Sequence, residues 1–576
     1  MTQTALAPTR GDNVRAIVKR ILCFALFVAA LIATFRTAWI VSTTLLDSDA
    51  SSSLLLGEKL SREGGILSTT FIYATELYVV DVQIIYSLLF RICSDWSLVR
   101  FWGAVIMQVL MIAAYGYLAK QARMSLNMFF VSAAALLLPF SVPYGRIVLY
   151  HNFYMPHVTL GFLTVGLYMG VASEKAAGRV WWKNAIRGGL LCLVAFLWGL
   201  SGVRPLMICA APLAVAAVLT GVLGEKRENR IRPECGALLW AAAMAAAMAA
   251  GYLVNANVLS NIYDFRRYDS QTLILASPEK REQIFRGFLA AGGYQDDIEL
   301  FEPHGFLAVT SVAAAMIGIV LSFLTLRRTK DRAARFLSLF YLMTVLITTC
   351  VFLFLGNQEF LYLLYYLPAI VWIIPALAKA DVLPLPEAEK LSRENWKEQV
   401  LGLKSPKLSL YRLTALVACG MLLCGGAYYT GFFRHPETYE GSIEYTGLNV
   451  FDTDTVEKLQ PVADYLRENG YTLGYASYWD AAVIMELTDG QTRMTAVEGS
   501  GRRKPLKYMN WLSDTELRDP GWAAQQKTVL VADIDNISPY ITDSEELMEN
   551  LERKEGINGY VIYELKDPAY LANMMN

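Results

Sequence analysis

The sequence predicts a polytopic α-helical membrane protein that ends in a soluble α/β domain. Hydrophobic residues make up 55% of the 576 residues and only 18% are charged, whereas about a quarter of a typical soluble domain is charged. The apolar residues are gathered in blocks of about 17–22 residues, long enough for a helix to cross a ~30 Å hydrocarbon layer. The region from residue 432 onward lacks such a block and alternates helix and strand patterns.

This composition also excludes several classes of protein. An ordinary cytosolic protein, a disordered chain and a small disulfide scaffold are all incompatible with it. The net charge of −1 gives no electrostatic support for nucleic acid, which we do not expect as a partner. The eight cysteines are mostly single and lie inside apolar blocks, so we expect neither a disulfide framework nor a zinc site.

We expect eleven membrane spans, each a near-continuous apolar run bounded by charged residues, Gly or Pro. The first resembles a signal peptide because Arg15, Lys19 and Arg20 precede it. Its apolar core is too long for a signal peptide and has no small-residue cleavage site, which favours a retained anchor. The predicted spans are 19–42, 98–118, 127–143, 157–173, 187–201, 206–223, 236–254, 306–326, 335–355, 361–378 and 411–431.

Basic residues fix the expected orientation, because Lys and Arg are enriched in cytoplasmic loops. The basic loops fall on the N-terminal side only if the apolar piece 82–93 does not cross the membrane. That piece has about a dozen residues and contains Arg91, so an interfacial helix is the better interpretation. The N-terminus is then cytoplasmic, and the protein is expected in the plasma membrane. The basic segments are 120–123, 175–187, 226–232, 327–335 and 379–410.

This topology divides the chain into two parts. Residues 1–431 form a membrane module whose first outer loop, 43–97, carries interfacial helices, and residues 432–576 form an extracytoplasmic α/β domain. In the 255–305 loop we expect a short helix over 277–291. In the tail we expect helices over 454–469, with Asp454 and Glu457 at capping-box spacing, and over 544–554. Strands are expected at 472–475, 529–533 and 560–565.

Two carboxylates, Asp47 and Asp49, stand where the first span ends, and a helical stretch ending at Gly64 follows them. One carboxylate could act as a general base toward an acceptor hydroxyl. The pair could instead hold a divalent metal on a phosphate-bearing donor. An exposed acidic helix end without a function is the remaining alternative, and spacing does not decide between them. Glu76, further along this loop, is a candidate substrate contact.

A first span, an acidic motif, a long outer loop with interfacial helices and a multi-span body resemble the GT-C superfamily of membrane glycosyltransferases. The chain is most similar to the bacterial protein mannosyltransferase and aminoarabinose transferase families, whose members often have an Asp-Glu pair and then a polar helix end before Gly. From Asp49 to Gly64 the chain reads DASSSLLLGEKLSREG and follows that rhythm. It departs at Ala50, where many members have Glu, and the second carboxylate is Asp47. The resemblance covers about residues 15–430 and implies that the protein is bacterial.

The resemblance implies a sugar donor carried on a polyprenyl phosphate. A hexose or pentose would be transferred to an acceptor outside the membrane, either an envelope glycan, a lipid-linked glycan or a protein. Asp49 is the first choice for the base and Asp47 for its partner, with the reverse assignment still open. Dependence on Mg²⁺ or Mn²⁺ is left open, because the family contains both modes. The rival hypotheses are a transporter or flippase of lipid-linked sugars and a non-catalytic scaffold that binds envelope glycan.

Two arginines are candidates for binding the donor phosphate. Arg204 lies in a tight outer turn between two spans, at the depth of a lipid phosphate, and Arg146 lies in the outer loop 144–156. Arginine suits bidentate phosphate binding. The alternative is that such residues only snorkel to the membrane surface and anchor a helix end.

Further polar and aromatic residues are candidate substrate contacts. His151, Tyr154 and His157 lie together at the end of the loop that contains Arg146, and the two histidines are weak evidence for a metal. Glu359 lies in a late outer turn. The aromatic residues of the tail could stack on sugar or form the core of the domain, with the core favoured: Tyr478, Trp479, Trp511 and Trp522.

Overall fold

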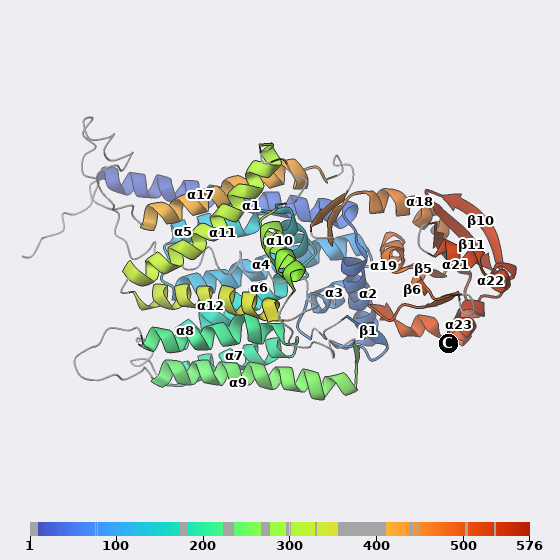
Figure 1. Cartoon of the computed structure of the whole chain (residues 1–576), viewed down its shortest axis with the longest axis horizontal. Coiled ribbons are helices and arrows are strands. Elements are labelled where there is room, and N and C mark those ends of the chain that lie inside the picture. The colour runs from blue at the N-terminus through green and yellow to red at the C-terminus, as the bar shows by residue number, and fades with distance from the viewer. Residues whose placement is uncertain are drawn as a thin grey trace, which may run out of the picture.

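A bundle of long apolar helices carries a domain of strands and shorter helices at one end (Figure 1). The structure is a computed structural model. It describes residues 10–74, 77, 79–172, 181–222, 235–265, 277–294, 299, 301–328, 331–354, 410–436, 442–445, 448–501, 505–534 and 537–576.

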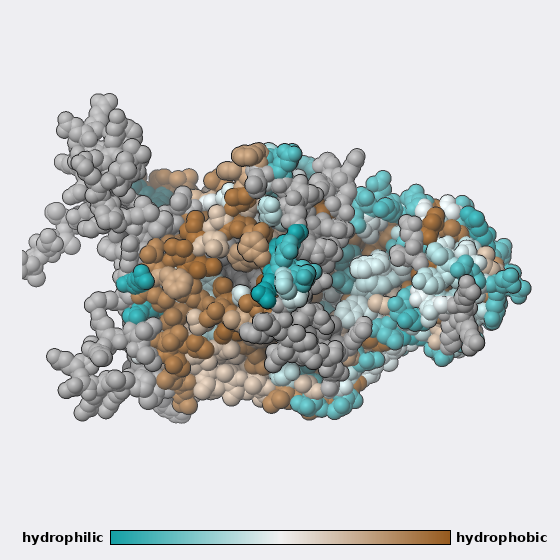
Figure 2. Space-filling model, viewed as in Figure 1, coloured by the Kyte–Doolittle hydropathy of each residue, from teal (hydrophilic) through white to brown (hydrophobic). Residues whose placement is uncertain are grey.

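Ten of the eleven predicted spans fall on described residues, and each coincides with a helix. The span 361–378 and the candidate Glu359 lie outside the described residues. Six helices are long and apolar enough to cross a membrane, and hydrophobic side chains cover the flank of the bundle (Figure 2). The bundle helices are α1 (Arg10–Thr44), α4 (Trp96–Gln121), α5 (Leu126–Leu137), α6 (Met155–Ala172), α7 (Trp181–Gly199), α8 (Ala211–Val222), α9 (Cys235–Asn257), α11 (Pro303–Arg328), α12 (Arg332–Phe354) and α17 (Leu410–Tyr428).

One predicted span ends earlier than expected. Helix α5 stops at Leu137 and not at residue 143, because Pro139 disfavours helical geometry at Leu138, which is extended at φ −90° and ψ 137°. The chain then forms an unpredicted π-helix, η1 (Tyr144–Tyr150), in which every residue is buried. The start of the expected outer loop 144–156 is therefore part of the protein interior. Two further π-helices are η3 (Leu206–Ala210) and η5 (Tyr429–Phe433).

The first long loop forms α2 (Ser48–Glu63), β1 (Phe71–Tyr73) and α3 (Gln83–Phe90). Helix α2 ends as predicted at Gly64, whose positive φ of 76° suits glycine. The eight residues of α3 rise about 12 Å, too little to cross a bilayer, which agrees with the prediction for 82–93. Tyr86 of α3 packs against Gly57 of α2 and Gly103 of α4, so closely that a Cβ at either glycine would overlap it.

The tail is built on a six-stranded mixed sheet of order β10-β11-β9-β5-β6-β7, which confirms the predicted α/β class. The predicted helix 454–469 is α18 (Asp454–Glu468), but its N-cap is Thr453, and Asp454 is already its first helical residue. The strands are β3 (Ser442–Tyr445), β4 (Leu448–Asp452), β5 (Leu473–Ser477), β6 (Arg493–Gly499), β7 (Leu506–Tyr508), β9 (Thr528–Asp533), β10 (Leu551–Ile557) and β11 (Tyr560–Leu565).

The prediction of a helix over 544–554 is wrong for its second half. Only α22 (Glu545–Glu549) is helical, and the chain then enters β10. Asn558 and Gly559 both have positive φ, which allows the tight turn that pairs β10 with β11. This pairing overrides the helix preference of the charged residues in β10. The other tail helices are α19 (Tyr478–Leu487), η7 (Thr515–Arg518), α20 (Pro520–Ala523), α21 (Ser538–Thr542) and α23 (Tyr570–Met575).

A small sheet joins three distant parts of the chain. Strand β1 of the first loop pairs with β2 (Asp264–Phe265), which follows α9 and η4 (Leu259–Asn261), and with β8 (Ser513–Asp514) of the tail. The helix predicted over 277–291 is α10 (Pro278–Ala291). The tail is thus tied by backbone hydrogen bonds to the loop that carries the acidic pair.

Candidate active site

The acidic pair lies at the N-terminus of α2, where α1 has ended and the tail domain packs on the bundle. Asp47 is the N-cap, and its carboxylate accepts a hydrogen bond of 2.8 Å from the backbone N–H of Ala50. Asp49 lies in the first helical turn. Carboxylates are favoured here because the first N–H groups of a helix lack partners and carry the positive end of its dipole.

Two side chains hold Asp47: Arg146 of η1 and His151, the residue that directly follows η1. Arg146 Nη2 lies 3.0 Å and His151 Nδ1 lies 2.6 Å from the same carboxylate oxygen. Their other nitrogens, Arg146 Nη1 and His151 Nε2, lie 3.2 Å and 3.1 Å from the carbonyl oxygen of Leu45. Burial alone would raise the pKa of Asp47, but His151, Arg146 and the Ala50 N–H outweigh it and hold that pKa well below its usual range.

The backbone explains why Arg146 and His151 face the pair. Pro139 ends α5 early, so the chain turns back and places η1 inside the protein, with Arg146 only 4% exposed. Asn152 then adopts φ 62°, a left-handed conformation that Asn tolerates better than most residues. This turn leads into α6 immediately after His151.

Asp49 has the opposite electrostatic environment. The Asp49 side chain is exposed to solvent on one side, and neighbouring parts of the protein partly desolvate its carboxyl group on the other. This desolvation and the nearby charge of Asp47 raise the pKa of Asp49 to about 6, and a hydrogen bond from the Tyr478 hydroxyl opposes the rise. Two carboxylates on one helical turn therefore differ in proton affinity, and only Asp49 is suited to gain and lose a proton near neutral pH.

The first turns of α2 are also bound by α19 of the tail. Ser48 donates its hydroxyl to the carbonyl oxygen of Trp479, and Ser51 donates to Glu486 Oε2 at 2.6 Å. Arg100 of α4 forms a buried two-point ion pair with Glu486, with Nε 2.7 Å from Oε1. Sequence reasoning missed Arg100 and Glu486, which are 386 residues apart and carry no local signal of pairing.

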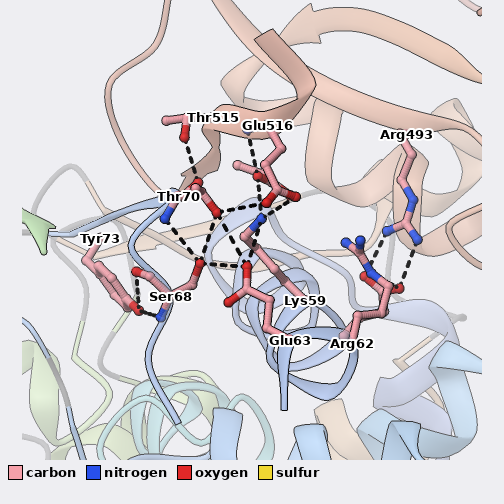
Figure 3. Close-up of polar contacts among 11 residues, drawn as sticks. Lys59, Arg62, Glu63, Ser68, Thr70, Tyr73, Arg493, Thr515 and Glu516 are labelled. Atoms are coloured by element: carbon pink, nitrogen blue, oxygen red, sulfur yellow. Dashed lines mark hydrogen bonds and ion pairs between the residues drawn. The ribbon is translucent and has the colours of Figure 1, made fainter. Parts of the chain in front are cut away.

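The remainder of α2 is clamped to the tail by two ion-pair groups (Figure 3). Lys59 is fully buried, with Nζ 2.8 Å from both Asp514 and Glu516 and 3.2 Å from Glu63. At the preceding residue of α2, Arg493 binds both carboxylate oxygens of Glu58 at 2.8 Å. Helix α2, which presents the acidic pair, is therefore positioned as much by the tail as by the bundle.

Arg204 belongs to a second cluster near the same end of the bundle. Its guanidinium lies 5.4 Å from the centre of the Tyr154 ring. Burial raises the pKa of the nearby Asp81 carboxyl to about 7, and the positive charge of Arg204 opposes this rise. His157 accepts a 2.9 Å hydrogen bond from Trp198 at Nδ1. Tyr86 lies between the clusters, within electrostatic range of Arg100 and Asp81.

The predicted residues thus fall into two groups. Asp47, Arg146 and His151 are brought together, and Asp49 joins them through its place on the same helical turn. Arg204, Tyr154 and His157 form the second group. Glu76 lies outside the described residues. Trp479 is not in the core as favoured from the sequence, since it is 65% exposed.

The described residues around the pair do not fit a metal site. Asp47 is engaged by Arg146 and His151, so cationic and N–H donors occupy the places where further oxygen ligands would be needed. The two histidines face different partners, Asp47 and Trp198. In the part of the chain that is described, no group of three His, Cys, Asp or Glu could hold a metal ion.

No family model and no curated protein sequence matches the chain. Its fold is similar to that of ArnT from Cupriavidus metallidurans. The ArnT structure bound to undecaprenyl phosphate superposes with a TM-score of 0.52 at 11% identity, over 96% of this chain and 98% of that one. The apo structure gives 0.50 at 12%, with the same coverage. An oligosaccharyltransferase from Archaeoglobus fulgidus gives 0.46 at 13%, over 94% and 74%.

The ArnT likeness spans both the helix bundle and the tail. It shows that the chain has the GT-C fold, a polytopic helical membrane module followed by a C-terminal soluble domain. The fold predicted from the sequence is thereby confirmed.

Proposed function

We propose that the protein is a membrane glycosyltransferase that moves a sugar from a polyprenyl phosphate to an acceptor hydroxyl. The observation that carries this proposal is the pair of carboxylates at the start of α2. Arg146 and His151 bind Asp47, whereas the Asp49 side chain is exposed and its pKa is raised to about 6. A neighbour with this fold, ArnT, was solved with undecaprenyl phosphate bound, which supports a polyprenyl phosphate as the donor carrier.

Asp49 is assigned as the general base. It takes the proton of the acceptor hydroxyl while that oxygen forms a bond to the anomeric carbon of the donor sugar. The bond from the anomeric carbon to the phosphate oxygen breaks, and the polyprenyl phosphate leaves with the electron pair. Attack from the face opposite the phosphate inverts the anomeric carbon. Asp47, kept ionised by Arg146 and His151, keeps the proton affinity of Asp49 high enough for this task.

Arg204 is assigned to the leaving phosphate in preference to Arg146. Both terminal nitrogens of Arg146 are already used, on Asp47 and on the carbonyl oxygen of Leu45. Arg204 lies over the Tyr154 ring, in the helical residues that lead into η3. A planar guanidinium there can bind two phosphate oxygens and stabilise the charge that develops as the phosphate leaves. Tyr154 and His157 then line the donor side.

The end of the bundle that carries the tail domain is inferred to face outward. The acceptor is then an envelope glycan, a lipid-linked glycan or a protein. A transporter or flippase is less well supported, because it would place charged groups along a path through the bundle. Among the described residues, the side-chain pairs of Asp47, Arg100 and Lys59 all lie where the bundle meets the tail.

The test uses the full-length protein in proteoliposomes with a panel of radiolabelled undecaprenyl-phosphate hexoses and pentoses. Membranes of a strain that lacks the protein supply the acceptor. We expect Asp49→Asn to lower transfer by at least 10²-fold while still binding undecaprenyl phosphate. Arg204→Gln should instead weaken that binding by about 10-fold or more. Undiminished transfer by Asp49→Asn would overturn the proposal.

A further inference from the structure

Helix α19 of the tail begins directly against the first turn of α2. Three residues of that turn contact it: Ser48 binds the Trp479 carbonyl, Asp49 accepts from Tyr478, and Ser51 binds Glu486. Because the hydrogen bonds of Ser48 and Ser51 hold α2 and α19 together, the phenol of Tyr478 is held at the carboxyl group of Asp49. A side chain from a part of the chain more than 400 residues away therefore touches the candidate base.

The contact is selective for one of the two carboxylate oxygens. The Tyr478 hydroxyl donates to Oδ1 of Asp49. No described residue hydrogen-bonds the other oxygen, Oδ2. Fixing Oδ1 therefore fixes the direction of Oδ2, the atom available to receive a proton from an acceptor.

We propose that Tyr478 is a positioning residue, through which the tail domain orients the Asp49 carboxylate and stabilises its ionised form. The inference rests on the proposed function of Asp49 as a base, and it names a residue of the tail as part of the catalytic arrangement. Tyr478 acts through Asp49.

The charges around Asp49 determine in which direction the Tyr478 hydroxyl moves the pKa of Asp49. The groups that act on it directly are Asp47, which disfavours its ionised form, and Tyr478, whose hydrogen bond favours it. Beyond them, Arg146 and His151 face Asp47, and Arg100 pairs with Glu486. Loss of the Tyr478 hydroxyl must therefore raise the pKa of Asp49 further.

Tyr478 itself remains a donor at all working pH values. Burial and the charge of Asp49 raise the pKa of the Tyr478 phenol well above its usual value, and the side chain of Trp511 also hydrogen-bonds it. The phenol thus stays protonated where Asp49 titrates, and the hydrogen bond changes only with the state of the carboxyl group.

The test measures the protonation of Asp49 without relying on activity. Water-soluble carbodiimides react with protonated carboxyl groups, so full-length protein in nanodiscs is labelled between pH 4 and 8, and the Asp49 peptide is quantified by mass spectrometry. We expect Tyr478→Phe to raise the labelling midpoint by about half to one pH unit. Tyr540→Phe is the matched control, because Tyr540 is an exposed residue of the same domain whose ring lies against Gly499 and not against Asp49. Its midpoint should equal that of the wild type.

A second variant guards against misfolding. Trifluorotyrosine at position 478 has nearly the shape of tyrosine and is a stronger donor, so it should lower the midpoint. Unchanged midpoints in both folded variants overturn the inference. In the transfer assay, the acid limb of Tyr478→Phe should move upward by the same amount, with undecaprenyl-phosphate binding unchanged. If the midpoints move but Asp49→Asn still transfers sugar, the proposed function fails and the Tyr478 contact stands.

Discussion

At the scale of single residues, neighbouring side chains give the two carboxyl groups of the acidic pair different proton affinities. Asp47 faces the bundle, where Arg146 and His151 hold it ionised. Asp49 faces the tail, where it meets a neutral phenol and the charge of Asp47. A permanently ionised carboxylate is a weak base, whereas one with a pKa near the working pH both accepts and releases a proton efficiently.

This division predicts the pH dependence of transfer. Asp49 must be ionised to act, so the rate should fall as the pH drops through about 6, higher than the ordinary aspartate pKa of about 4. Asp47→Asn should move this limb to lower pH by about one unit or more, because it removes the anion that disfavours ionised Asp49 and leaves Arg146 uncompensated. The measurement is the pH profile of sugar transfer by each protein in the same proteoliposomes.

Asparagine at position 47 can still cap α2, so the variant is expected to keep the start of the helix. Circular dichroism and thermal unfolding check this. A limb that stays at the wild-type pH in folded Asp47→Asn would show that another group controls the titration.

The sequence predicted some of the residues of the candidate site and missed others. Asp47 and Asp49 stand out because a charged pair at the end of a span is unusual in an apolar chain. Tyr478 is only one of the tail aromatics that could stack on sugar or pack in the core, and Glu486 has no distinguishing feature in the sequence. Both gain their contacts with α2 only when α19 meets it. Arg100 lies within the predicted span 98–118, where no pattern indicates a partner, yet it is buried in an ion pair.

At the scale of elements, α2 is the element on which the site depends. Its N-terminus carries the acidic pair, and its other turns are bound to the tail through Lys59 and Glu58. Apolar length predicted the bundle helices, and Gly64 predicted the end of α2. Helix η1 and strand β10 could not be predicted, because one depends on the turn after Pro139 and the other on pairing with β11.

The clamp around Lys59 predicts a stability effect. Lys59→Met leaves Asp514 buried without its cation, so we expect the thermal unfolding temperature to fall, with a loss of about 3–5 kcal/mol. The double variant Lys59→Met/Asp514→Leu removes both charges and should recover most of the loss. Lys458→Met is the control, because its pair with Asp454 is 3.8 Å long and exposed, and such pairs contribute ~0–1 kcal/mol.

The readout is thermal unfolding in detergent together with limited proteolysis, which detects release of the tail. Equal loss in the single and double variants would mean that the unpaired charge of Asp514 is not the source of the lost stability. An unchanged Lys59→Met protein would mean that the clamp does not hold the tail.

At the scale of the whole molecule, the two ends of the helix bundle differ in what they carry. The tail, α2 and α3 lie at one end (Figure 1). The sequence predicts that basic loops gather on the opposite side, where the N-terminus lies. Lys120 stands at the far end of α4 from Trp96, and Trp96 binds Asp489 of the tail through its backbone N–H. We infer that the two ends of α4 lie on the two sides of the membrane.

This arrangement predicts which exposed positions react in intact cells. In a cysteine-free background, Asn573→Cys on the tail should react with a membrane-impermeant maleimide, whereas Lys120→Cys should react only after the membrane is permeabilised. Both side chains are exposed, so a difference in labelling reports the side of the membrane and not burial. Labelling of Lys120→Cys in intact cells would reverse the orientation. The acidic pair would then face the cytoplasm, and the proposed transfer to an envelope acceptor would no longer fit the topology.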